Sequence, residues 1–374
     1  MSDLATPTQW IDVFHCDDPR DAVHQAVACL AQGGVIGLAT ETSYGLAASA
    51  LHAESADRLI ELVGQSARPL TLMIKGPDEA SDWVPGIPPV GHRLARRLWP
   101  GPLNLVFPPS MADGLLTRLP RRVRDLLGTD QSLELGSSGD PFFRDILEFS
   151  PAPLVLGTLE TNSGPVVSPE ALRGLSGLEM VIDSGPTVSP GFCTRVRIDE
   201  GSWSIERAGV IDGRTLTQMS GMILLFVCTG NTCRSPMAEG ICKLLLSRRR
   251  GCSIEELETQ GFLAISAGVA ATTGAPAAAH AASVLRAMGG TLDDHRSRRL
   301  TFELLKHADF IFAMTADHLD ALLDAMPGVR DHAFLLDPDG GDVPDPIGAD
   351  EATYRQTARR IEQMLEERLN QLGI

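Results

Sequence analysis

Residues 226–240 read FVCTGNTCRSPMAEG, where an apolar strand ends at a cysteine and a short polar turn leads to an arginine and a serine. Five residues separate Cys228 from Arg234, and Gly230 and Asn231, which tolerate tight backbone turns, lie among them. The backbone N–H groups of such a turn can converge on one point, which the positive end of the following helix also faces. The stretch therefore predicts an anion-binding loop between a buried strand and a helix.

The residues around this turn also predict its chemistry. Ser235 is a good N-cap and Pro236 a good first helical residue, so we expect a helix from about residue 236. The field that holds an anion also favours a thiolate, which makes Cys228 a candidate nucleophile. Arg234 adds a planar charged fork that can hold two oxygens of a phosphoryl group. We therefore expect phosphoryl transfer through Cys228.

The loop CTGNTCRSPMAE (228–239) resembles that of the low-molecular-weight protein tyrosine phosphatase family, which has the form Cys-x5-Arg-Ser. The resemblance covers nearly all of residues 222–372, because further family motifs follow in the family's order: ISAG (265–268), DDHRSRRL (293–300), ADFIFAMT (308–315) and DVPDPIG (342–348). It implies that Cys228 attacks phosphorus, that a phosphocysteine forms and that water then releases phosphate. It also implies that Asp345 is the general acid and that no metal is required.

The same resemblance implies phosphate binding or loop support for the other residues of the loop: Thr229, Gly230, Asn231, Thr232, Cys233 and Ser235. Asn231 is expected to brace the loop, and Ser235 to donate a hydrogen bond to the thiolate. Two interpretations of Cys233 stay open. It is either a small buried apolar residue or a resolving thiol that pairs with Cys228 under oxidation.

Two details bear on the phosphorylated protein substrate. Phosphotyrosine enzymes of the family usually carry aromatic residues after the catalytic Asp-Pro, whereas this chain has Ile347 and Gly348 there. Thr232 stands where the protein arginine phosphatases of the family have threonine, and its hydroxyl could accept a hydrogen bond from a guanidinium. We therefore favour phosphoarginine, with phosphotyrosine next. An aromatic wall supplied by Tyr354 or Phe192 is the alternative.

The first half of the chain resembles the YrdC-like family, which includes threonylcarbamoyl-AMP synthases that use threonine, bicarbonate and ATP. The resemblance covers about residues 20–212 and rests on four stretches: QGGVIGLATETSYGLAASA (32–50), RLARRLWPGPLNLVF (93–107), TNSGPVVSPEAL (161–172) and VIDSGP (181–186). It implies an open twisted α/β sheet around a cavity, and double-stranded RNA binding as a family property. The possible N-terminal ligand site comprises Thr40, Thr42, Tyr44, Arg68 and Thr194.

Several ligand motifs of that family are altered here. A Lys-x-Arg pair that meets nucleotide phosphates is replaced by LVGQ (62–65), with Arg68 displaced. Ser-x-Asn becomes LET (159–161), and Ser-Thr-Val becomes CTR (193–195). Losing cationic ligands while gaining Glu160 should weaken ATP binding, since each charge-assisted hydrogen bond contributes roughly 1.5 to 3 kcal/mol. Three roles stay open: an active synthase, a degenerate module that binds a nucleotide or another small ligand, and a docking or regulatory domain.

The length of 374 residues predicts two domains. A polar stretch, DGRTLTQMSG (212–221), resembles a linker before the strand-like MILLFVC, so we expect a YrdC-like domain over 1–220 and a phosphatase domain over 221–374. In the second part, strand-like runs at 223–227, 262–268 and 310–314 alternate with helical segments, and an amphipathic helix ends the chain. The expected fold class is α/β, with an open twisted sheet followed by a doubly wound parallel sheet.

The net charge of −16 disfavours a broad nucleic-acid surface, so tRNA is not expected as a tight direct partner. The phosphatase needs no cofactor, whereas ATP or another nucleotide is an expected ligand of the first domain. Seven cysteines without a regular framework, none of them after Cys252, argue against both a disulfide scaffold and an arsenate reductase relay. The chain shows neither a signal-peptide pattern nor a membrane-length apolar run, so we expect a cytoplasmic protein.

Overall fold

The computed structural model describes residues 7–64, 69–112, 114–128 and 131–374. The chain divides into two compact units, Met1–Met219 and Ser220–Ile374. Each unit has its own hydrophobic cores. The two are described separately below.

The second unit is built on a parallel sheet with β13 in its interior. Within the described residues its strand order is β14-β13-β15-β16, and every pairing is parallel. The strands are β13 (Met222–Cys228), β14 (Phe262–Gly268), β15 (Phe310–Ala313) and β16 (Ala333–Leu335). Because β13 is covered on both faces, it is apolar throughout and reads as a continuous hydrophobic run.

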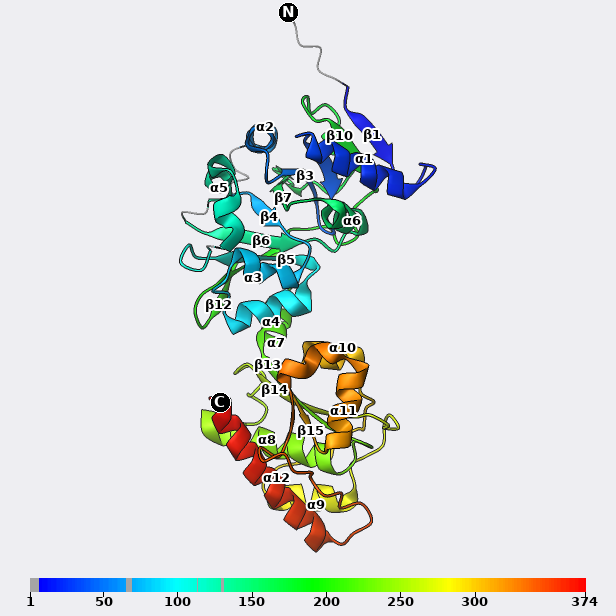
Figure 1. The fold of residues 1–374 in the computed structure, drawn as a ribbon, viewed down its shortest axis with the longest axis vertical. Coiled ribbons are helices and arrows are strands. Elements are labelled where there is room, and N and C mark those ends of the chain that lie inside the picture. The colour runs from blue at the N-terminus through cyan, green and yellow to red at the C-terminus, as the bar shows by residue number, and fades with distance from the viewer. Residues whose placement is uncertain (1–6, 65–68, 113, 129–130) are drawn as a thin grey trace, which may run out of the picture. The chain divides into compact units, whose positions relative to one another are not determined.

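Helices cover both faces of this sheet. They are α8 (Arg234–Arg250), α9 (Ala279–Ala287), α10 (Phe302–His307), α11 (Ala316–Ala325) and α12 (Glu351–Gln371), with a short 3₁₀ turn η5 (Pro327–His332). Leu224 and Phe226 of β13 pack into the core shared with α8, α9 and α12, whereas Leu225 and Val227 face the core shared with α10 and α11. Figure 1 shows α8, α9 and α12 on one side of the sheet and α10 and α11 on the other.

The first unit contains a mixed sheet. Within the described residues its order is β1-β10-β2-β3-β7-β4-β6-β5-β11-β12, with a separate pair β8-β9. The strands are β1 (Gln9–Asp12), β2 (Ile36–Ala39), β3 (Tyr44–Ser49), β4 (Thr71–Met73), β5 (Gly101–Phe107), β6 (Leu133–Ser137), β7 (Leu154–Thr158), β8 (Glu160–Thr161), β9 (Gly164–Pro165), β10 (Met180–Asp183), β11 (Thr194–Ile198) and β12 (Trp203–Arg207). Its end strands β1 and β12 do not pair with each other, so the sheet is open.

Helices flank this sheet too. They are α1 (Pro19–Ala31), α2 (Ala53–Val63), α3 (Ala80–Trp83), α4 (Pro89–Leu98), α5 (Arg121–Leu127), α6 (Pro141–Phe149) and α7 (Gly213–Ser220), with 3₁₀ turns η2 (Pro77–Glu79), η3 (Gly114–Arg118) and η4 (Pro169–Leu172). Helices α1 and α6 pack on one core and α2, α4 and α5 on the other. The sheet is therefore covered on both faces.

The expected α/β fold class is confirmed for both units. Three local expectations need correction. The stretch expected to be a linker forms helix α7, because the Asp212 carboxylate caps it at Thr215 N and Leu216 is fully buried. Helix α8 begins at Arg234, two residues earlier than expected. Elements α10, α11 and β16 lie in stretches for which no element was predicted.

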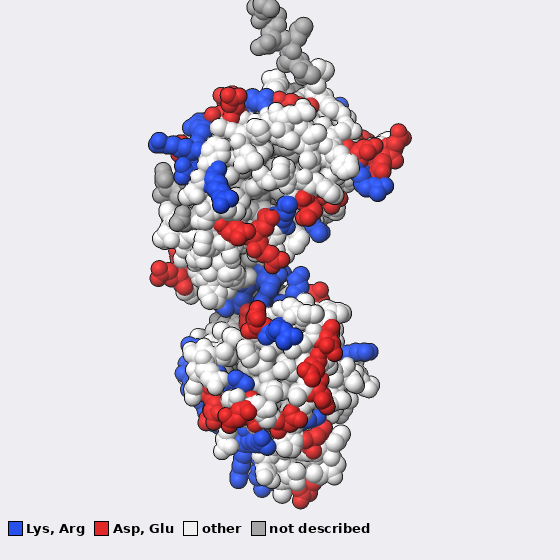
Figure 2. All heavy atoms as spheres, in the orientation of Figure 1, with Lys and Arg blue, Asp and Glu red and all other residues white. Residues whose placement is uncertain are grey.

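The surface and the helices give two further observations. Lys and Arg lie interspersed with Asp and Glu on the face of each unit drawn in Figure 2. Among the residues that the structure describes, no helix is both long and apolar enough to cross a bilayer.

Candidate active site

Cys228 ends β13, at the carboxyl edge of the parallel sheet, where open α/β folds place their ligands. Its side chain is 3% exposed. Two hydrogen-bonding groups face the sulfur: Asn231 N donates to Sγ at 3.3 Å, and Ser235 Oγ lies 2.9 Å from it. The loop therefore wraps its own polar groups around the cysteine.

Asn231 has the only positive φ among the described non-glycine residues, 55°. Its side chain is fully buried and fully used: Nδ2 donates to Ser235 Oγ at 3.0 Å and Ser266 Oγ at 2.9 Å, and Oδ1 accepts from Arg298 N at 2.8 Å. A left-handed backbone costs an ordinary residue roughly 1 to 2 kcal/mol, which these bonds offset. Asn231 thus braces the loop in this structure.

A second layer of polar groups holds Asn231 from behind the loop. His295 Nε2 donates to the Asn231 carbonyl oxygen at 2.8 Å. Ser266 Oγ donates to Glu239 Oε2 at 2.7 Å, and Glu239 pairs with Lys243 at 2.5 Å. Ser266 lies in the ISAG motif and Glu239 ends the quoted loop stretch, but sequence reasoning gave neither a role, because nothing in the sequence shows that β14 and α8 bring them together.

Ser235 does not cap α8 as the sequence suggested. The N-cap position is Cys233, and Ser235 lies inside the helix with 0% exposure. Its hydroxyl contacts Cys228 Sγ and accepts from Asn231 Nδ2, so it is not free to cap the helix. Helix α8 begins before Ser235 because the Ser235 hydroxyl bonds to Cys228 and Asn231 instead of capping the helix.

Arg234 and Asp345 meet beside the loop. Arg234 Nη2 donates to Asp345 Oδ2 at 2.6 Å, and Nη1 donates to the Val343 carbonyl at 3.2 Å. The arginine side chain is 7% exposed, whereas the aspartate is 40% exposed. The loop after β16 thus brings a carboxylate from 111 residues away to the arginine of the anion loop.

His318 is a residue of this site that sequence reasoning missed. Its Nε2 lies 2.8 Å from Thr229 Oγ1, and its Nδ1 lies 2.7 Å from Thr315 Oγ1, the residue that caps α11. Burial, and after it the charge of Arg234, lower the pKa of His318. The cap motif Thr-x-x-His was a signal for the local turn, but nothing in the sequence placed it next to Thr229.

The remaining loop residues have distinct surroundings. Thr232 is half-buried, and its hydroxyl lies 3.7 Å from Cys233 Sγ. Cys233 is a free thiol that contacts the Tyr354 hydroxyl at 3.2 Å. Burial, and then Cys233, raise the pKa of the Tyr354 phenol above its usual range. Tyr354 is 3% exposed beneath Cys233, so it does not form an exposed aromatic rim.

In the first unit, Thr40 and Thr42 line a cavity of only about 20 Å³ together with Glu41, Asn104 and Cys193. Tyr44 and Thr194 do not line it. The Tyr44 hydroxyl donates to the Gly185 carbonyl at 2.7 Å, and that of Thr194 donates to the Ile211 carbonyl at 3.2 Å. Arg68 lies outside the described residues. The expected ligand residues are therefore only partly gathered in one place.

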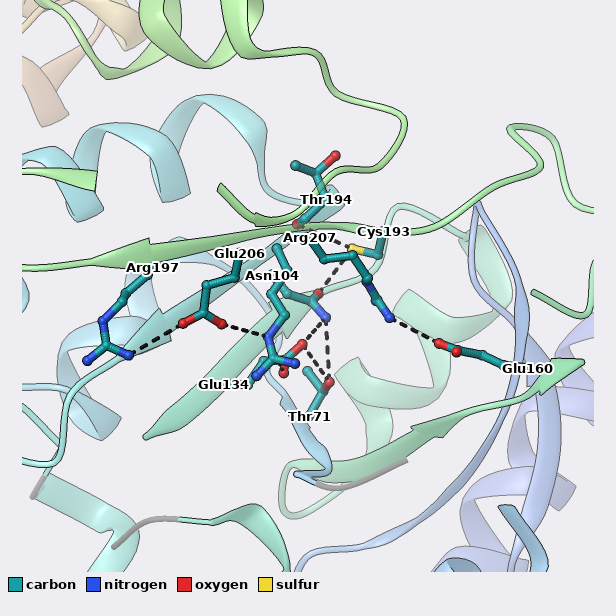
Figure 3. Close-up of polar contacts among 10 residues, drawn as sticks. Thr71, Asn104, Glu134, Glu160, Cys193, Thr194, Arg197, Glu206 and Arg207 are labelled. Atoms are coloured by element: carbon teal, nitrogen blue, oxygen red, sulfur yellow. Dashed lines mark hydrogen bonds and ion pairs between the residues drawn. The ribbon is translucent and has the colours of Figure 1, made fainter. Parts of the chain in front are cut away.

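Figure 3 shows ion pairs and hydrogen bonds around Asn104 and Cys193, two residues that line this cavity. Glu134, 3% exposed, accepts from Asn104 Nδ2 at 2.5 Å and pairs with Arg195 Nε at 3.1 Å. Arg207 pairs with Glu160 at 3.0 Å. Two residues that depart from the family motifs, Glu160 and Arg195, thus pair with residues of the chain itself.

In the described parts of the chain, no group of three or more His, Cys, Asp or Glu side chains has the arrangement that could hold a metal ion.

Comparisons with known proteins cover both units. Residues 223–373 match the family of low molecular weight phosphotyrosine protein phosphatases. This region is 38% identical over 155 residues to the protein-arginine-phosphatase of Bacillus subtilis (strain 168), covering 40% of this chain and 97% of that protein. It is 30% identical over 154 residues to the low molecular weight protein-tyrosine-phosphatase Etp of Escherichia coli (strain K12), covering 41% and 95%.

The first unit also has known relatives. Residues 28–209 match the family of Sua5, YciO and YrdC proteins, described as telomere recombination. Over 86 residues the chain is 37% identical to the threonylcarbamoyl-AMP synthase of Pyrococcus abyssi (strain GE5 / Orsay). That alignment covers 23% of this chain and 25% of the synthase. The chain therefore joins a YrdC-like domain to a phosphatase domain.

The hydrogen bonds of Asn231 lead to a first prediction. Asn231→Ala should lower kcat/KM for a small aryl phosphate by about 10²-fold, because misplacing the loop by as little as about 1 Å has effects of that size. Asn231→Gly should recover part of the loss, since glycine adopts the left-handed backbone without strain. Steady-state kinetics on folded variants measures both. Full activity in Asn231→Ala would show that the Asn231 side chain is not needed to hold the catalytic loop in place.

The lowered pKa of His318 predicts a pH effect on stability. As pH falls below 6.5, the ordinary histidine value, the unfolded chain takes up a proton that the folded unit resists, so the folded state loses stability. His318→Gln should make the melting temperature of the second unit less sensitive to acid between about pH 7 and about pH 5. His24→Gln, at an exposed histidine of the first unit, is the control. Unchanged acid sensitivity in His318→Gln would contradict the assignment.

Proposed function

Through residues 223–373 this chain belongs to the low molecular weight phosphotyrosine protein phosphatase family and is a protein phosphatase, and on that premise we propose that Cys228 carries the phosphoryl group through a phosphocysteine intermediate. One observation carries this proposal. Cys228, the Arg234 guanidinium and the Asp345 carboxylate converge at one loop although the aspartate comes from a distant segment. Nucleophile, anion ligand and acid are the three groups that the reaction needs.

In the first step, the Cys228 sulfur attacks phosphorus, the bond from phosphorus to the leaving atom breaks, and an S–P bond forms. The phosphoryl oxygens take hydrogen bonds from the loop N–H groups and from the Arg234 fork. The Ser235 hydroxyl, 2.9 Å from Sγ, can donate to the sulfur as a thiolate. The Asn231 amide and the Ser235 hydroxyl already face the sulfur, so these two groups need little reorganisation during the attack.

Asp345 gives its proton to the leaving atom in this step. Its carboxylate pairs with Arg234 at 2.6 Å. A bound phosphoryl group competes for the same guanidinium, and its arrival frees Asp345 to take up a proton and to face the leaving group. The aspartate side chain is exposed enough to exchange that proton with solvent.

In the second step, water attacks the phosphocysteine, the S–P bond breaks, and inorganic phosphate leaves. Asp345, now deprotonated, accepts the proton of the attacking water. Arg234 stays with the transferring group through both steps, because a guanidinium keeps its charge throughout.

We propose phosphoarginine in proteins as the favoured substrate and phosphotyrosine as the next. The relative of highest identity named above is a protein-arginine-phosphatase. Thr232 is half-buried in the loop, where its hydroxyl can accept from a substrate guanidinium, and Ile347, 70% exposed, stands where an aromatic wall would serve a phenyl ring. Because Tyr354 is buried, it supplies no aromatic wall, and the smaller aliphatic side chain of Ile347 stands in that place.

The substrate proposal predicts a reversal of preference. Wild-type protein should release phosphate faster from phosphoarginine peptides than from phosphotyrosine peptides of the same sequence. Thr232→Ile should lower the phosphoarginine rate by about tenfold, the loss of one hydrogen bond to a charged group, while leaving the phosphotyrosine rate near wild type. Cys228→Ser is the blank. A wild-type preference for phosphotyrosine would overturn the specificity, and phosphate release by Cys228→Ser would overturn the mechanism.

For the first unit we propose a degenerate YrdC-like module in which ATP or another nucleotide binds weakly. Two observations support this: the cavity lined by Thr40 has a volume of only about 20 Å³, and the Arg207 guanidinium is paired with the Glu160 carboxylate. Burial, and then Glu41 and Glu134, raise the pKa of the Cys193 thiol at this cavity well above the ordinary value, which disfavours its thiolate.

This second proposal predicts that Glu160 opposes anion binding. Glu160→Gln should tighten ATP binding by about tenfold, because it frees the Arg207 guanidinium for a phosphate. Isothermal titration of the full chain with ATP measures the change, and Glu160→Gln with Arg207→Gln should lose the gain. Pyrophosphate release by the wild-type chain from ATP, threonine and bicarbonate would contradict a degenerate module, and this assay should not depend on Cys228.

A further inference from the structure

The second unit contains a cavity of about 430 Å³ behind the anion loop. Helix α8, the segment directly after it and residues 289–298 line this cavity. Its volume lies within the range of about 300 to 1,000 Å³ that is typical of small-molecule sites. Cys228, Arg234 and Asp345 are not among its lining residues, so it is separate from the proposed catalytic groups.

Three residues that line the cavity hold Asn231. His295 Nε2 donates to its carbonyl oxygen and Arg298 N donates to its Oδ1, both at 2.8 Å. Glu239 reaches it through Ser266, whose hydroxyl contacts both residues. A molecule in the cavity would therefore touch the groups that fix the loop beneath Cys228.

His295 presents an acceptor that has no protein partner at this cavity. The residue is 9% exposed, and because its Nε2 faces a carbonyl oxygen, Nε2 carries the proton. The other nitrogen, Nδ1, is then an acceptor in the neutral ring. No hydrogen-bond partner for Nδ1 exists among the described residues. An N–H group of a ligand would satisfy it.

The charges that line the cavity define the ligand further. Lys243 is paired with Glu239, and Arg296 donates to the carbonyls of Asp293 and His295. Within the described residues, three exposed lining side chains have no charged or hydrogen-bonding partner in the protein: Arg298, Glu255 and Asp294. The unpaired set is one cation and two carboxylates. A small molecule with one anionic and two cationic groups would pair with these three charges.

We propose that this cavity binds a basic amino acid such as L-arginine, and that the bound molecule stabilises the anion loop. The α-carboxylate pairs with Arg298, the two cationic groups pair with Glu255 and Asp294, and one N–H donates to His295 Nδ1. The regulatory half of this inference rests on the phosphatase site proposed at Cys228, whereas the binding half does not.

The hydrogen bonds give the direction of the effect. A donor on Nδ1 polarises the imidazole, and this strengthens the bond from Nε2–H to the Asn231 carbonyl, because linked hydrogen bonds reinforce one another. A loop held more firmly binds an oxyanion more tightly. By linkage, the oxyanion and the amino acid raise each other's affinity by the same factor.

Isothermal titration of the full chain with L-arginine, with and without saturating orthovanadate, tests both halves. We expect binding that tightens by about fivefold when vanadate is present, the lower end of common coupling factors. L-Citrulline, which lacks the guanidinium charge, and agmatine, which lacks the carboxylate, should each bind about tenfold more weakly. No arginine binding would overturn the site, and binding without any vanadate effect would overturn the coupling.

Paired variants locate the binding. Glu255→Gln with Asp294→Asn should weaken arginine binding by at least about tenfold and leave the basal hydrolysis of p-nitrophenyl phosphate unchanged. Asp320→Asn with Asp324→Asn, which removes two exposed carboxylates of α11 outside the cavity, is the matched control and should bind like wild type.

Three outcomes separate this inference from the proposed function. Equal loss of binding in both double variants would contradict the cavity, and so would arginine binding that saturating orthovanadate abolishes, because such arginine would occupy the anion loop itself. Arginine binding that depends on Glu255 and Asp294 in a chain that hydrolyses no phosphate ester would support the site while overturning the function proposed at Cys228.

Discussion

The site depends on one turn of backbone, the left-handed conformation at Asn231. That conformation turns the chain so that the Asn231 amide faces the Cys228 sulfur, and it is held by bonds on every polar group of the residue. The partners come from β14, α8 and the segment before α10. The loop therefore keeps its shape only while three separate parts of the second unit are packed around it.

The parallel sheet explains why these parts meet. The carboxyl ends of β13, β14 and β15 lie at one edge, so Cys228 and Ser266 lie near that edge and Thr315 follows it. Helix α8 begins inside the loop and brings Arg234 and Ser235 to the same place. The segment after β16 then adds Asp345, which rests on Arg234 until an anion competes for the guanidinium. Rigid elements thus carry the donors, and an exposed loop carries the acid.

Local sequence predicts only what neighbouring residues decide. The strand, the turn and the spacing of Cys228 and Arg234 lie in one stretch, so the anion loop could be predicted from it. Asp345 could be singled out only through the family motif, because several acids lie beside it. The contacts of His318 and Ser266 with the loop, and of Glu239 with Ser266, could not be found, since they arise from the packing of separate elements. In the first unit, the hydroxyls of Tyr44 and Thr194 face backbone carbonyls that no motif reveals.

The central claim is that the oxyanion binds at the Cys228 sulfur within the loop that Asn231 shapes. A crystal structure of the full chain with orthovanadate tests it most directly. We expect vanadium bonded to Cys228 Sγ, with its oxygens on the loop N–H groups and on the Arg234 fork, and with Asp345 displaced from that arginine. Vanadate bound elsewhere, or bound at Arg234 without a bond to the sulfur, would contradict it.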